Sequence, residues 1–114
     1  MSYQDEMEFL KEQLNKNKCK ILNPHRAKEV LKAFGVIKIM VGKSDEETTV
    51  EILGGALEAG DVAIRIVTPN FTVYDTSKFA DIIQTADDVD VYPTADDRIK
   101  VDIHFQNAYY VQTL

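Results

Sequence analysis

Apolar and polar side chains alternate without interruption from Ile99 to Phe105. Successive side chains of a β-strand point to opposite faces of its sheet, so the apolar members of this segment would share one buried face. Lys100, Asp102 and His104 would share the other face. The sequence therefore predicts a strand near the carboxyl end that packs a core on one side and presents polar groups on the other.

Short strands are predicted along most of the chain after residue 35. Segment 89–92 precedes the Ile99 strand across a five-residue loop, 93–97, which is typical of a hairpin. Other strands are predicted at 36–41, 48–53, 62–67, 71–74 and 108–112, with an extended link at 19–22. Segment 44–60 also resembles a helix, because Ser44 and Glu47 have the spacing of a capping box. Its β-branched residues and paired glycines favour a strand over 48–53 instead.

Helical spacing predicts three helices. Apolar residues recur at Tyr3, Met7, Leu10 and Leu14, which indicates an amphipathic helix over 3–15. A second helix is predicted from Pro24 to Phe34, with Asn23 as its N-cap and Gly35 as its left-handed stop. A third would follow the possible caps at 75–77 and run to Ala86, burying Phe79, Ile82, Ile83 and Ala86. Asp87 and Asp88 then stand at the negative end of its dipole, a placement that the sequence does not explain.

This order of elements predicts an α+β fold. The N-terminal helices would be followed by a mostly antiparallel, strongly curved sheet or a small partly closed β-barrel, with one further helix. A doubly wound parallel sheet fits poorly, because only one crossover helix lies between strands. The chain of 114 residues is expected to form a single domain, 1–114, in which the helical part, 1–35, packs on the β-rich part, 36–114.

Composition narrows the class of protein. The chain is 45% apolar and 28% charged, as in folded proteins, and it has no run of apolar residues long enough for a membrane helix. The polar start is unlike a signal peptide. Cys19 is the single cysteine, which excludes an intrachain disulfide and a cysteine-based metal site. We therefore expect a cytoplasmic protein that does not contact membranes and needs no cofactor.

Charge is divided unevenly along the chain. Nine basic residues stand against five acidic ones up to Lys43, whereas four basic residues stand against fourteen acidic ones from Ser44 onward. Such asymmetry can mark a surface that binds a polyanion, because clustered lysines release the counterions condensed on a nucleic acid. Alternatively, the basic segment folds against the acidic one and the charges compensate internally.

No motif of nucleotide binding is complete. Gly42-Lys43-Ser44 matches the end of a Walker A motif, but Ile37 occupies the position of its first glycine. Five aspartates surround the predicted hairpin, yet they lack the glycine and glutamate of an EF-hand, and a solvated acidic rim explains them. No metal site is predicted. Asp102 and His104 would lie on one side of a strand, where a carboxylate can orient an imidazole as a general base if both share a cleft.

Three functional hypotheses remain. The first is a small non-enzymatic binding or regulatory module that contacts a macromolecular partner, with a homodimer as one possibility. The second is an RNA-binding protein on a small barrel of the kind used by PUA-type modules, which is an analogy of fold alone. Its contacts would come from Lys16, Lys18, Lys20, His25, Arg26, Lys28 and Lys32 within the basic segment 16–43, and bases would stack on Tyr92, Tyr109 or Tyr110. The third is a small enzyme that uses Asp102 and His104 as an acid-base pair.

Overall fold

The computed structural model describes residues 3–16, 19–21, 23–42, 47–54, 60–69 and 77–111. Along the chain, its elements are α1 (Tyr3–Lys16), β1 (Cys19–Ile21), α2 (Pro24–Gly42), β2 (Thr49–Leu53), β3 (Val62–Thr68), α3 (Ser77–Thr85), β4 (Asp88–Pro93), β5 (Ile99–Phe105) and β6 (Tyr109–Val111). The predicted strand at 71–74 lies outside the described residues. None of the helices among the described residues is long and apolar enough to cross a membrane.

The predicted α+β class and the antiparallel pairing are confirmed. Strands β2, β3, β5 and β4 form one antiparallel sheet in that order, and β1 pairs with β6 in a separate two-stranded ribbon. The sheet is open, because its edge strands β2 and β4 pair neither with each other nor with a second described neighbour. The described strands therefore do not form the predicted partly closed barrel. Four strands are too few to close on themselves, and the other two strands among the described residues pair with each other instead.

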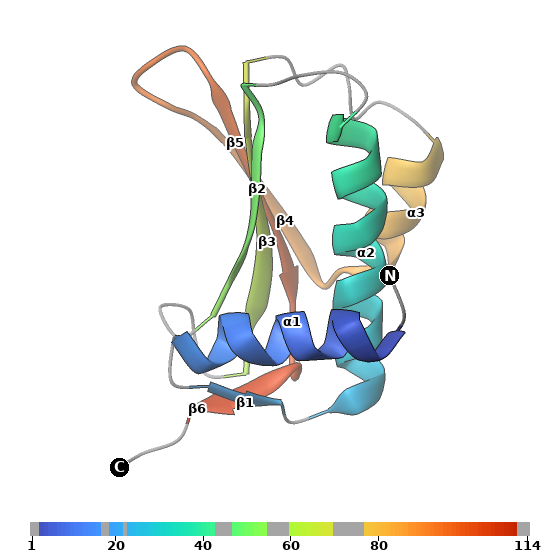
Figure 1. Cartoon of the computed structure of the whole chain (residues 1–114). Helices are drawn as coiled ribbons and strands as arrows, with labels where there is room; N and C mark the ends of the chain where they lie inside the picture. Colours follow the sequence, from blue (N-terminus) through green and yellow to red (C-terminus); the bar gives the residue numbers. More distant parts are fainter. Residues whose placement is uncertain are drawn as a thin grey trace.

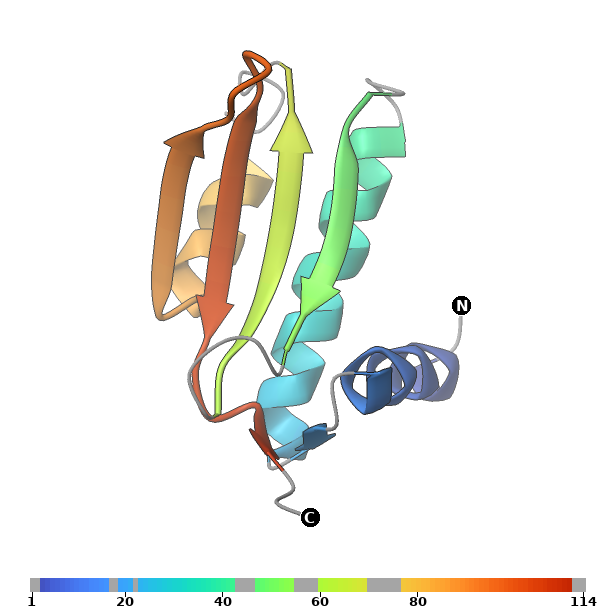
Figure 2. The ribbon, with the colours of Figure 1, turned by 90° about the vertical axis from the view of Figure 1, so that its left-hand side faces the viewer.

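Helices cover one face of the sheet. Figure 1 shows α2 and α3 side by side against this face, with α1 crossing the lower part of α2 next to the β1–β6 ribbon. The alternation in β3 and β5 explains the contact, since Ile64, Ile66, Val101 and Ile103 are fully buried and belong to the main core. Figure 2 looks onto the other face, which the helices do not cover and which we call the open face.

Helix α2 is longer than the sequence predicts. It runs through Gly35 to Gly42, so neither the helix end at Gly35 nor the strand at 36–41 exists. Val30, Phe34 and Ile37 recur at helical spacing and are all buried, whereas Ile39, expected inside a strand, is 62% exposed. Burial of this stripe against the sheet outweighs the roughly 1 kcal/mol that a glycine costs inside a helix.

The remaining elements follow the predicted positions closely. The strands at 48–53, 62–67, 89–92 and 99–105 and the third helix all form, within one to two residues of the expected bounds. One detail of the third helix is wrong: Ile83 is 37% exposed, although Phe79 and Ile82 are buried as expected. In α1, Leu10 and Leu14 are each 1% exposed, so this part of the predicted apolar stripe is covered by the chain itself.

Candidate functional site

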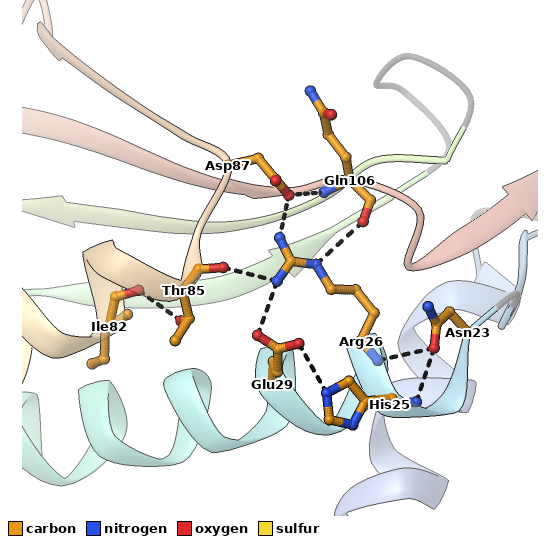
Figure 3. A network of polar contacts seen from close by, with 8 residues as sticks. All are labelled: Asn23, His25, Arg26, Glu29, Ile82, Thr85, Asp87 and Gln106. Atoms are coloured by element: carbon orange, nitrogen blue, oxygen red, sulfur yellow. Dashed lines mark hydrogen bonds and ion pairs between the residues drawn. The ribbon is translucent and has the colours of Figure 1, made fainter.

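The start of α2 is capped as the sequence predicts. The Asn23 side-chain oxygen accepts hydrogen bonds from the backbone N–H groups of His25 and Arg26, at 3.1 and 3.2 Å. This cap fixes the first turn of the helix. It thereby directs the Arg26 side chain toward the end of α3 and the turn that follows β5, as Figure 3 shows.

The Arg26 guanidinium is held by four groups. Its Nε donates to the Gln106 carbonyl at 3.2 Å, and its Nη1 donates to the Thr85 carbonyl at 2.8 Å and to Glu29 at 3.0 Å. Its Nη2 pairs with Asp87 (Figure 3). The side chain is only 14% exposed and lies over the Phe105 ring, 5.1 Å from its centroid. Arg26 therefore joins three elements inside the protein.

These contacts explain the acidic end of α3. The Asp87 carboxylate accepts the Gln106 backbone N–H at 2.7 Å as well as the Arg26 guanidinium. The Gln106 N–H, followed by Arg26, lowers the pKa of Asp87 below its usual value against an opposing effect of burial. An acid that is unfavourable for the helix dipole is thus stabilised by residues distant in sequence, a relationship with no local signal.

The other residues of the predicted nucleic-acid surface are distributed over several places. His25 has a side chain that is 84% exposed and lies 3.6 Å from Glu29. Lys28 and Lys32 are exposed on the same outer side of α2, and Lys16 is exposed at the end of α1. Lys20 belongs to β1, where only its backbone is described, and Lys18 lies outside the described residues. The structure thus brings His25, Lys28 and Lys32 together and places Arg26 inside.

A groove of about 430 Å³ separates the exposed sides of α2 and α3. We call it the α2–α3 groove. It is lined by Glu29, Lys32, Ala33, Val36, Ile39 and Met40 from α2, and by Asp81, Ile82 and Thr85 from α3. Ala33 and Ile82 are buried, Val36 and Met40 are half-buried, and Ile39 is exposed at the margin. Sequence reasoning missed this surface, because it assigned 36–41 to a strand and so separated residues that share one helix face.

Three charged residues line the α2–α3 groove, and they differ in their partners. Glu29 is engaged by Arg26 and His25. The side chains of Lys32 on α2 and Asp81 on α3 make no ion pair or hydrogen bond within the part of the chain that the structure describes. Two charges of opposite sign therefore stand on opposite walls of an apolar groove.

A second polar cluster lies on the open face. Arg65 opposes Asp102 across β3 and β5, and its Nε and Nη2 donate to the two carboxylate oxygens at 2.9 and 3.0 Å. The Tyr92 hydroxyl donates to the same carboxylate at 2.6 Å. Burial would raise the pKa of Asp102, but the hydrogen bonds from Arg65 and Tyr92 outweigh it and the pKa is lowered. Burial and Asp102 raise the pKa of Tyr92, which keeps its hydroxyl protonated as a donor.

His104 does not bond to Asp102. The two side chains share the open face, as the alternation predicts, but the His104 Nε2 lies 3.1 Å from Asp90. Asp102 instead accepts hydrogen bonds from Arg65 and Tyr92, and it is 4% exposed. The imidazole of His104 is thus oriented by Asp90 and not by a hydrogen bond to Asp102, the contact on which the acid-base hypothesis depends.

The aspartates near the hairpin that have described partners each contact a different group. Asp87 pairs with Arg26, Asp90 with His104, and Asp96 with Arg98 at 2.7 Å. Asp88 accepts the N–H of the next residue at 2.9 Å. Within the described ranges, no three histidine, cysteine or acidic residues are grouped so that they could hold a metal ion.

Two surfaces therefore differ in kind. On the open face, the Lys100 ammonium lies over the Tyr92 ring, 4.5 Å from its centroid. Tyr92 is thus on the opposite side of the sheet from α2 and its lysines. The α2–α3 groove, by contrast, combines an apolar floor with two charges that lack partners among the described residues.

Comparison with known proteins gives no matching family model, no matching curated protein and no matching solved structure.

Proposed function

We propose that this chain is a non-enzymatic protein-binding module, and that the α2–α3 groove takes an amphipathic helical segment of a protein partner. The observation that carries the proposal is an apolar groove of about 430 Å³ with Ile39 62% exposed at its margin. Exposed apolar surface in a concave site is costly in water, and a partner that covers it gains free energy.

The dimensions of the groove favour a helix as its occupant. The α2 residues that line it extend from Glu29 to Met40, roughly 16 Å along the axis at the usual rise of an α-helix. This length matches about three turns of a second helix, whose apolar residues at positions i, i+3, i+4 and i+7 would follow the floor. Ile39, one of the lining residues, is 62% exposed, so an occupant that packs on its side chain gains the most apolar contact.

Charge favours a partner with an acidic flank. Lys28 and Lys32 are exposed beside the α2 wall, although the chain as a whole carries a formal charge of -6. An acidic flank would meet these lysines, which guide encounter and choice of partner more than they add affinity. The RNA hypothesis receives less support, because Arg26 is engaged inside the protein and Tyr92 lies on the other side of the sheet. The enzyme hypothesis lacks its central contact.

Fluorescence anisotropy with a designed probe tests the proposal. The probe is a labelled helical peptide of about five turns with a leucine stripe and glutamates beside it, titrated with protein up to about 1 mM. We expect saturable binding that Ile39→Ser weakens about tenfold. The matched control is Val91→Ser, because Val91 is also an exposed apolar residue (55%) but belongs to the edge strand β4. That variant should bind as the wild type does.

Other outcomes would contradict the proposal. Absence of peptide binding, or equal losses in the two variants, would show that the groove is not the docking surface. Salt-sensitive binding of a single-stranded RNA without peptide binding would support the RNA hypothesis instead. Light scattering of the protein alone completes the test, since a dimer that Ile39→Ser dissociates would identify a second copy as the occupant.

A further inference from the structure

The two walls of the α2–α3 groove carry opposite charges. Lys32 stands on the α2 wall and Asp81 on the α3 wall, and both are exposed. The third charged lining residue, Glu29, is bonded to Arg26 at 3.0 Å and so contributes little net charge of its own. The groove therefore presents one positive and one negative wall on either side of an apolar floor.

We infer that the groove selects a partner helix by the order of charges across it: acidic residues on the flank beside Lys32 and basic residues on the flank beside Asp81. This inference rests on the proposed function and specifies its partner. An amphipathic helix that lays its apolar stripe on the floor places one polar flank against each wall. Each flank then meets either an opposite or a like charge.

The same geometry fixes the direction of the bound helix. If a helix with one acidic and one basic flank is reversed end to end on the floor, its flanks exchange walls. Both pairs then become like-charge contacts, as between mismatched charged positions of coiled coils. A partner with this charge order therefore binds in a single direction. A partner with two acidic or two basic flanks makes one unfavourable contact in either direction.

Three peptides with the same leucine stripe test the inference at low ionic strength, where exposed charge pairs are least screened. One carries an acidic and a basic flank, one carries two acidic flanks, and one carries two basic flanks. We expect the wild type to bind the mixed peptide about fivefold more tightly than either of the others, as exposed ion pairs allow. Asp81→Lys should transfer the preference to the doubly acidic peptide, and Lys32→Glu to the doubly basic one.

Glu51→Lys is the matched control for Asp81→Lys, because it also replaces an exposed acidic residue by lysine, but on the open face and away from the groove. It should leave the order of the three affinities unchanged. If all three peptides bind the wild type and both wall variants equally well, the charge-order inference is overturned while the docking groove stands. If no peptide binds the wild type, the proposed function itself fails. A preference that Glu51→Lys alters as strongly as Asp81→Lys would show a general charge effect and would also overturn the inference.

Discussion

Arg65 and Asp102 oppose each other in the register of β3 and β5 and form two parallel hydrogen bonds at 2.9 and 3.0 Å. The pair lies on the open face of the sheet, yet the Asp102 side chain is only 5% exposed, because neighbouring side chains cover it. A buried carboxylate needs such partners, since removal of one of them leaves the other uncompensated. This relationship makes the open face a stabilising element of the fold.

Asp102→Asn should destabilise the protein by about 2 kcal/mol. The amide keeps the size of the side chain but cannot neutralise Arg65, whose own side chain is 28% exposed and so stays partly hydrated. The free energy of unfolding, taken from urea denaturation, measures the loss. Asp81→Asn is the control, because Asp81 is exposed and should change stability by no more than about 0.5 kcal/mol. Equal midpoints for Asp102→Asn and the wild type would contradict this account.

The dependence of stability on pH should have a definite sign. The pKa values of Asp87 and Asp102 are both lower in the folded protein than usual. Their contribution is therefore complete above the unfolded pKa of about 3.9, and it is lost as pH falls through the lower folded values. We expect the free energy of unfolding to fall steeply below about pH 4. In the double variant Asp87→Asn/Asp102→Asn, this fall should be much shallower, so its deficit relative to wild type narrows in acid.

Arg26→Lys should cost about 2–3 kcal/mol although it conserves the charge. A lysine offers one ammonium group and cannot reach the Gln106 carbonyl, the Thr85 carbonyl and Asp87 in the fixed directions of a guanidinium. Urea denaturation gives the measurement, with Lys32→Ala as a control expected within about 0.5 kcal/mol of wild type. A loss for Arg26→Lys as small as that for the control would mean that the contacts of Arg26 do not hold α2 to the end of α3.

Strands were predictable where the alternation of apolar and polar residues follows from a sheet that is covered on one face only. In β3 and β5, every second residue faces the helices, so the alternation from Val62 and from Ile99 directly reflects a sheet covered on one side. The cap at Asn23 was predictable for a similar reason, because its partners lie within three residues. Local chemistry is sufficient in both cases.

The errors concern interactions between residues far apart in the chain. Gly35 and the β-branched residues after it favour a turn and a strand when each is considered locally, and burial of Ile37 against the sheet decides otherwise. Arg26 resembles a surface cation beside its lysine neighbours, but its partner Asp87 is 61 residues away. The α2–α3 groove depends on both features that the sequence did not reveal, because it needs the long helix α2 and the contacts that hold α3 beside it.

The two glycines at positions 35 and 60 provide the last prediction, because the structure gives them opposite conformations. Gly35 lies within α2, whereas Gly60 has a φ of 97°, in the region that disfavours side chains. Gly35→Ala should therefore stabilise the protein by about 0.5–1 kcal/mol and raise Tm by about 3–6 °C. Gly60→Ala should destabilise it by at least about 1 kcal/mol.

Thermal unfolding followed by circular dichroism measures both glycine variants. The comparison is informative because a glycine that ended a helix at position 35 would have a positive φ, and alanine there would be unfavourable as at position 60. A lowered Tm for Gly35→Ala would thus indicate that the helix stops at Phe34. In that case Val36, Ile39 and Met40 would no longer share a helix face, and the α2–α3 groove that they line would not exist.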